Sequence, residues 1–207
     1  MIKALQLLFE PGPTWERIAN ASRSVSAVLF LWLVPWVLVA CVVEGWGLHT
    51  LGNQRDPLEF SSQPATSVPF ERLVRYEIAQ VVLHVMVVFA LAVIFRFLLR
   101  SFHCKRPLAV SFSLMAYCFG PVLLMQCLDG IPQIPTWVCR LIGVALSIKV
   151  FYLGLARVAR PDPTTALGLY FVGSFLLIAL NGLSHFLALR VLQGTLLGEL
   201  NLPGLGS

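Results

Sequence analysis

The fold is decided by residues 78–99, IAQVVLHVMVVFALAVIFRFLL, an apolar run in which the polar side chains are Gln80, His84 and Arg96. A helix that crosses the ~30 Å hydrocarbon layer of a membrane needs about 20 residues. The run is long enough for this, so it predicts a membrane-spanning helix.

Four further apolar runs of similar length lie at residues 25–43, 108–128, 134–158 and 166–192. None shows the alternation over about ten residues that is typical of a membrane β-strand. Pro35 lies inside the first of these runs and Pro121 inside the second, and proline breaks or kinks a helix. We therefore predict an all-α, polytopic membrane protein, a bundle of five transmembrane helices with helix breaks at Pro35 and Pro121.

The composition of the 207-residue chain favours the same class. The chain is 57% hydrophobic and 12% charged, and its mean hydropathy is +0.81, whereas soluble domains are about 25% charged. A large soluble domain is therefore excluded. The net charge of +5 comes without a basic stripe that contains aromatic residues, so we expect the lipid bilayer, and no nucleic acid, as a partner.

The positive charges predict the orientation, because Lys and Arg concentrate in cytoplasmic loops. With a cytoplasmic N-terminus the inner segments hold nine of these residues, namely Lys3, Arg17, Arg23, Arg96, Arg100, Lys105, Arg106, Arg157 and Arg160. The outer segments then hold four, namely Arg55, Arg72, Arg75 and Arg190. We predict a cytoplasmic N-terminus and an extracytoplasmic C-terminus.

Three segments are expected outside the spans. Residues 1–24 form a cytoplasmic interfacial segment, residues 44–77 an outer loop, and residues 193–207 a C-terminal tail. In the first segment apolar residues recur at helical spacing on both sides of Pro11–Pro13, which indicates two short helices that lie at the membrane surface or pack on the bundle. A short helix over residues 70–75 is expected to lie on the outer surface.

Two cations fall inside the fourth span, where a central Lys or Arg costs about 2.5 to 3.5 kcal/mol on insertion scales. Arg140 and Lys149 are nine residues apart, so at about 100° per residue they point to opposite faces of a helix. Arg140 is expected near the outer ends of the other spans. Its candidate ion-pair partners there are the acidic residues Glu44, Glu77 and Asp129.

Lys149 lies deeper, at the predicted depth of Tyr117 in the third span. Pro121 frees the carbonyl four residues before it, that of Tyr117, and Lys149 is expected to donate a hydrogen bond to this carbonyl or to the phenol. His84 is placed one turn further out. The candidate intramembrane polar cluster is therefore Lys149, Tyr117 and His84, and the alternative is that both cations are structural braces.

The sequence contains no catalytic motif. It has no G-x-S-x-G, no H-E-x-x-H and no phosphate-binding loop. The five cysteines form no C-x-x-C pair and the four histidines are scattered, so no metal site and no disulfide framework are expected. We predict a protein that is not an enzyme, with no catalytic residues and no cofactor.

Two motifs carry a resemblance to a known family. The sequence PTWERIA at residues 13–19, and Ala-Tyr at 116–117 followed by Gly-Pro at 120–121, resemble the Yip family, the Rab-interacting integral membrane domain, in a compact bacterial-type form. The resemblance implies five spans with a cytoplasmic N-terminus. Eukaryotic members associate with prenylated small GTPases, but the acidic-Leu-Tyr-Gly-Pro motif of those members has no match around residues 20–28.

We therefore expect a non-enzymatic scaffold that organises membrane proteins or lipids, in the inner membrane of a bacterium. Gly143 and Ser147 form a small-xxx-small pair, which favours close packing within the bundle or self-association. A membrane-protein partner or self-association is expected. One alternative is a small permease or lipid-handling channel with a polar path near Lys149. Another is an accessory subunit of a larger membrane complex, which predicts an exposed apolar face.

Overall fold

The computed structural model describes residues 2–21, 23–51, 70–104, 106–129, 131 and 134–192. Every regular element in these ranges is a helix, so the all-α prediction is confirmed. The elements are α1 (Ile2–Phe9), α2 (Pro11–Asn20), α3 (Val25–Val28), η1 (Leu29–Leu33), α4 (Val34–Leu51), α5 (Phe70–Ser101), α6 (Leu108–Cys118), α7 (Gly120–Asp129), α8 (Thr136–Gly154), η2 (Leu155–Ala159) and α9 (Pro163–Leu192).

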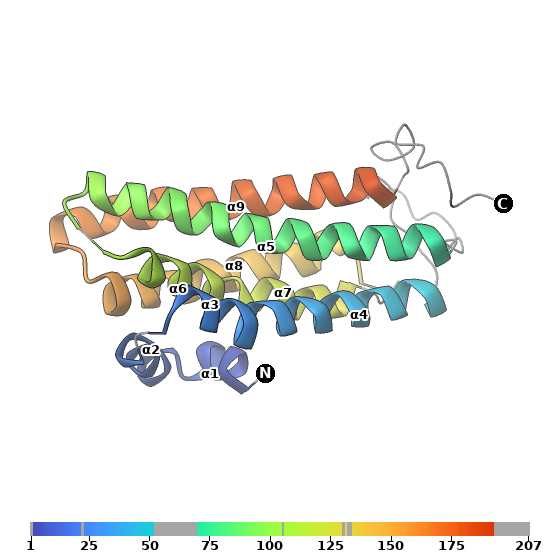
Figure 1. The fold of residues 1–207 in the computed structure, drawn as a ribbon, viewed down its shortest axis with the longest axis horizontal. Helices are drawn as coiled ribbons and strands as arrows, with labels where there is room; N and C mark the ends of the chain where they lie inside the picture. Colours follow the sequence, from blue (N-terminus) through green and yellow to red (C-terminus); the bar gives the residue numbers. More distant parts are fainter. Residues whose placement is uncertain are drawn as a thin grey trace.

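Within the described ranges, five helical segments are long and apolar enough to cross a membrane, which confirms the predicted number. They are Val25–Thr50, Phe70–Ser101, Leu108–Asp129, Thr136–Ala159 and Pro163–Val191. These segments run roughly along one common axis (Figure 1). We call the end where α4 ends and α5 begins the distal end, and the end where α5 ends and α6 begins the proximal end.

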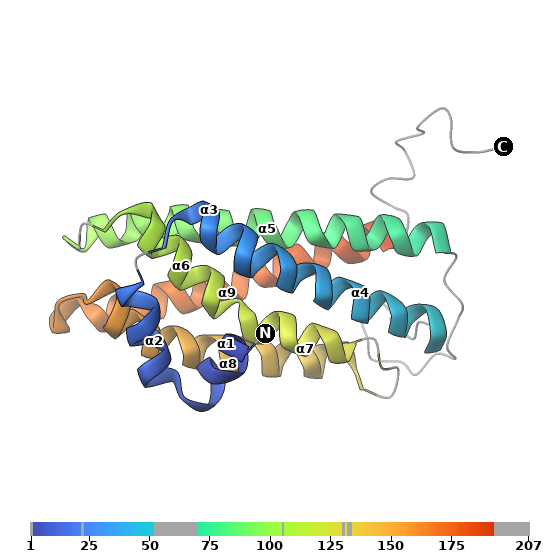
Figure 2. The same ribbon diagram turned by 60° about the horizontal axis from the view of Figure 1, so that its bottom comes forward.

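The third span, made of α6 and α7, forms the centre of the bundle. In its most apolar window 72% of the residues are buried, against 22–39% in the other four spans. It contacts α4, α5 and α8, while α9 lies along α5 (Figure 2). Side chains on the outer spans therefore have an inner face toward this central helix and an outer face toward lipid.

The two prolines predicted to break helices have different effects. At Pro121 the helix does divide, because α6 ends at Cys118 and α7 begins at Gly120. At Pro35 the helix continues from α3 to α4, and the turn before it is the π-helix η1, where the amide of Val34 donates to the carbonyl of Leu29. A wider π turn re-satisfies backbone groups beside a proline, so this span does not break.

The first two spans are longer than the sequence indicated. The first was expected to end at residue 43 and the second to begin at residue 78, but α4 runs to Leu51 and α5 begins at Phe70. The expected surface helix over residues 70–75 is the first part of α5. Glu44 and Glu77 therefore lie inside helices, and residues 52–69 and the tail 193–207 lie outside the described residues.

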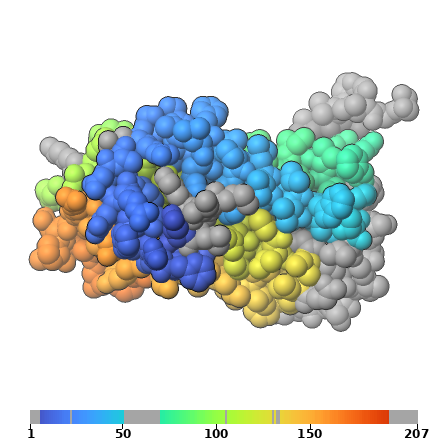
Figure 3. Space-filling model, turned by 90° about the horizontal axis from the view of Figure 1, so that it is seen from below, coloured from blue at the N-terminus to red at the C-terminus, as the bar shows by residue number. Residues whose placement is uncertain are grey.

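The N-terminal segment packs on the bundle. Helix α2 contacts α8 and η2, and α1 contacts α7 and α8, as Figure 3 shows for the dark blue segment. Trp15 of α2 is fully buried, and its indole Nε1 donates to the backbone carbonyl of Val150 at 3.2 Å. Its ring also fills the space beside Gly154, where an added Cβ would come within 2.6 Å of it.

Candidate functional site

The most polar buried feature of the described bundle is centred on Glu44. This carboxylate is 0% exposed and lies on α4, near the distal end. Tyr76 and Gln80 of α5 both reach it, because they are four residues apart and share one face of that helix. The Tyr76 hydroxyl donates to Oε1 at 3.0 Å, and Gln80 Nε2 donates to both carboxylate oxygens at 3.1 Å.

Gln126 of α7 brings a third span to the same carboxylate. Its Nε2 donates to Glu44 Oε2 and to Gln80 Oε1. We call Glu44, Tyr76, Gln80 and Gln126 the Glu44 cluster. Because polar groups inside a membrane protein must find internal partners, these bonds tie the first, second and third spans together.

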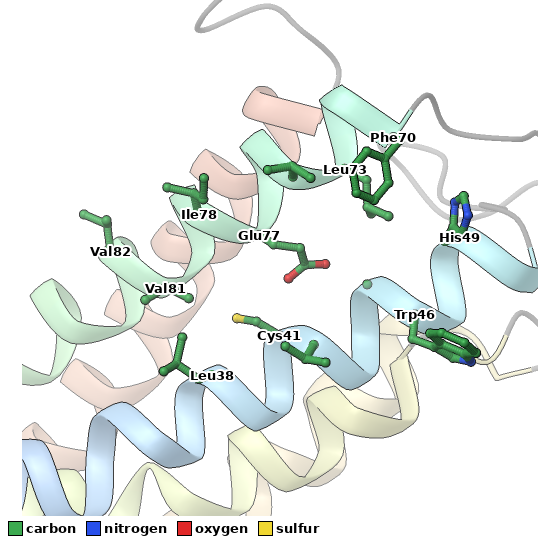
Figure 4. A pocket seen from close by; sticks show the side chains of 13 residues that line it. Leu38, Cys41, Trp46, His49, Phe70, Leu73, Glu77, Ile78, Val81 and Val82 are labelled. Carbon is green, nitrogen blue, oxygen red and sulfur yellow. The ribbon is translucent and has the colours of Figure 1, made fainter.

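Glu77 lies beside the Glu44 cluster and faces a groove between α4 and α5. Figure 4 shows its carboxylate and the sulfur of Cys41 in the space between the two helices. Gly45 allows this approach, since an added Cβ there would lie 2.9 Å from Glu77 Oε1. The groove has a volume of about 530 Å³, and nearly all its other lining residues are apolar.

Arg140 of α8 lies close to Gln80 of the Glu44 cluster and pairs with Asp129. Its Nη2 is 4.0 Å from Asp129 Oδ2, and the Asp129 side chain is 1% exposed. Arg140, Gln80 and His84 also line one small cavity together with Ser184 and His185 of α9. Of the three predicted acidic partners, the structure pairs Arg140 with Asp129 and places Glu44 with the amides and the phenol.

Lys149, Tyr117 and His84 do not form the predicted cluster. Tyr117 is buried in an aromatic group, with its ring centroid 4.8 Å from that of Trp32 and 6.2 Å from that of Trp15. His84 packs against Phe119 at 5.5 Å.

Lys149 is exposed and makes no hydrogen bond or ion pair in the part of the chain that the structure describes. The predicted bond to Tyr117 is therefore wrong. The physical reason is the rotation of α8. This helix turns Gly143, Ser147 and Val150 toward the bundle, so Lys149 falls on its outer face.

Sequence reasoning missed the amides and the phenol of the Glu44 cluster. Gln80 and Gln126 were available signals, since each is an amide inside an otherwise apolar run and must find a hydrogen-bond partner there. The sequence indicates Trp15 as part of the PTWERIA motif and of a short apolar helix face. The role of Trp15 as the anchor of the N-terminal segment depends on Gly154, which is distant in the sequence.

The chemistry of this arrangement is that of helix association. The phenol of Tyr76 and the amide nitrogens of Gln80 and Gln126 donate to acceptors within the Glu44 cluster, and the cluster presents no nucleophile paired with a base. Among the described residues no group of three or more His, Cys, Asp or Glu side chains could hold a metal ion.

Comparisons with known proteins agree with the motifs at residues 13–19 and 116–121. A family model described as the Yip1 domain matches residues 5–184. No curated protein and no solved structure matches the chain. The matched region contains all the elements of the Glu44 cluster and the Trp15 anchor, and the chain therefore belongs to the Yip1 domain family.

Proposed function

We propose that this protein is a scaffold in the membrane, which organises other membrane proteins or lipids without catalysing a reaction. It is an integral, multi-pass membrane protein of the Yip1 domain family, and this family is generally non-enzymatic. The proposal includes a location in a bacterial inner membrane. It also includes a cytoplasmic N-terminus, which the distribution of Lys and Arg supports.

The observation that carries the proposal is the set of hydrogen bonds that joins three spans at Glu44. Glu44 accepts hydrogen bonds from Tyr76, Gln80 and Gln126, so the strongest polar groups inside the bundle are used to hold its helices together. A bundle whose first three spans are joined by hydrogen bonds to one buried carboxylate suits a protein that acts through its outer surface.

The permease alternative receives less support. A polar path near Lys149 requires that side chain, Tyr117 and His84 to face a common space. Tyr117 is instead buried among tryptophan rings, and Lys149 is on the lipid-facing side. The groove between α4 and α5 is lined almost entirely by apolar residues, which suits acyl chains better than a polar solute.

The test combines two measurements on one preparation. The tagged chain is purified from its native membranes in a mild detergent, and the co-purifying proteins and lipids are identified and quantified by mass spectrometry. The same protein is then reconstituted in phosphatidylcholine vesicles, and the flux of small solutes is measured for wild type and for Glu44→Gln.

A scaffold predicts defined membrane proteins or lipids at constant stoichiometry, and no solute flux above that of empty vesicles. Solute flux that wild type supports and Glu44→Gln changes would favour the permease and refute the scaffold. The variant provides the control, because a contaminating transporter would give the same flux in both samples.

A further inference from the structure

The outer face of α8 carries an unpaired cation near the middle of a candidate membrane span. Lys149 lies in the span Thr136–Ala159, ten residues from its proximal end and thirteen from its distal end. At 1.5 Å per residue these separations are about 15 Å and 20 Å, which exceed the reach of a lysine side chain. Among the described residues Lys149 has no hydrogen bond and no ion pair.

Helix geometry also directs this side chain away from the nearer surface. The Cα–Cβ bonds of a helix tilt toward its N-terminus, and α8 begins at Thr136, which is the farther end. Lys149 therefore starts in the unfavourable direction for reaching water at the proximal end. A carboxylate partner at the same depth would satisfy the charge within the membrane.

The exposed residues around Lys149 form a line with the spacing of a helix-packing surface. They are Ile142, Ala145, Lys149, Tyr152 and Ala156, all exposed, and we call them the α8 seam. Their separations alternate between three and four residues, as in left-handed pairs of membrane helices. Ala145 and Ala156 have short side chains, so a second helix can approach closely on both sides of Lys149.

Charge complementarity decides what fits the α8 seam. A carboxylate at the same depth would neutralise Lys149, whereas lipid headgroups lie at the membrane surface, about 15 Å away. The described spans of a second copy bring no carboxylate at this depth. The acidic residues in the described spans are Glu44, Glu71, Glu77 and Asp129, all toward the distal end.

We propose that the α8 seam is the docking surface for a transmembrane helix of another protein, one that carries an aspartate or glutamate near its midpoint. The carboxylate of that helix pairs with Lys149 and sets the register of the contact, as a single lysine does in a helix seam. This inference rests on the proposed scaffold function and names its class of partner.

The test uses synthetic transmembrane helices as probes. The full chain, labelled with a donor dye at its C-terminus, is reconstituted in phosphatidylcholine nanodiscs. Three acceptor-labelled leucine–alanine helices are added, identical except for Glu, Gln or Leu at the midpoint. Energy transfer measures the affinity of each probe for wild type, Lys149→Met, Lys149→Arg and Arg100→Met, the last being a control that removes an exposed cation at the end of α5.

Wild type is expected to bind the Glu probe about three- to thirty-fold more tightly than the Gln or Leu probe, the range measured for polar contacts between membrane helices. Lys149→Met should lose this preference, while Lys149→Arg and Arg100→Met should keep it. Equal binding of the three probes to wild type overturns the proposal, as does a preference that persists in Lys149→Met. The tryptophan emission and helical circular dichroism of each variant check that it is folded.

Two further outcomes separate this inference from the scaffold function. If the same partners co-purify with wild type and with Lys149→Met, the scaffold function is supported, but the α8 seam is not the surface that binds these partners. If nothing co-purifies with wild type but the Glu probe binds selectively, the α8 seam is supported as a docking surface and the scaffold function is refuted. Energy transfer between two labelled copies of the chain that Lys149→Met abolishes would identify a second copy as the occupant and overturn the proposal.

Discussion

Replacing Gln126 with leucine should destabilise the bundle through the Glu44 cluster. The substitution removes the hydrogen bonds that Gln126 Nε2 donates to Glu44 and to Gln80, and its longer contact of 3.9 Å with the sulfur of Cys41, while it keeps a side chain of similar size. Hydrogen bonds between membrane helices are worth about 0.6 kcal/mol on average and up to about 1.7 kcal/mol. The expected loss for two bonds is therefore about 1 to 3 kcal/mol in the free energy of unfolding.

The assay is reversible unfolding in mixed micelles, in which the fraction of sodium dodecyl sulfate is increased and tryptophan emission is followed. The variants Gln126→Leu, Glu44→Leu and their combination form a double-mutant cycle. A coupling energy of about 1 kcal/mol is expected, because the two side chains share a hydrogen bond. The control cycle combines Gln126→Leu with Tyr152→Phe, which lies on the outer face of α8 and should be additive.

Additive effects of Gln126→Leu and Glu44→Leu would refute the reasoning, since they would show that the two side chains do not stabilise each other. A stabilised single variant would be equally damaging. It would mean that the free-energy cost of burying the Glu44 carboxylate exceeds the stabilisation by its hydrogen-bond partners, as occurs for some buried charges.

Two more substitutions test the packing and the ion pair with the same assay. Gly154→Ala should cost about 1 to 3 kcal/mol in the free energy of unfolding, because its Cβ would lie 2.6 Å from the ring of Trp15 and overpacking carries that penalty. In the control Gly182→Ala the added Cβ meets nothing within 4 Å, so this variant should be neutral or stabilising. Equal effects of the two substitutions would exclude the Trp15 contact as the cause. Arg140→Met should cost about 1 to 2 kcal/mol, below the 3 to 5 kcal/mol of a fully buried pair, because its distance to Asp129 is 4.0 Å and its side chain is 18% exposed. Asp129→Asn combined with Arg140→Met should recover part of that loss, and no recovery would mean that the pair does not contribute.

The number of spans could be predicted because hydropathy depends on each residue alone. The distal ends of the first two spans could not be predicted, because they depend on contacts between residues of different helices. The sequence predicts that the first span ends before Glu44, since an isolated carboxylate inside a membrane is unfavourable. Glu44 continues the helix because Tyr76 and Gln80 of the next span satisfy it, and the sequence does not show which side chains meet across two helices.

The position of Lys149 depends on a different property, the rotation of α8 about its axis. The spacing of nine residues correctly separated Arg140 from Lys149, and the structure pairs Arg140 with Asp129 and leaves Lys149 exposed. Which cation faces inward could have been inferred from Ser147, a small residue that lets helices approach. At about 100° per residue Arg140 lies about 20° from Ser147 around the helix, and Lys149 lies about 160° from it. Small residues in a span therefore locate its inner face, and a cation on the other side of the helix needs a partner from outside the chain.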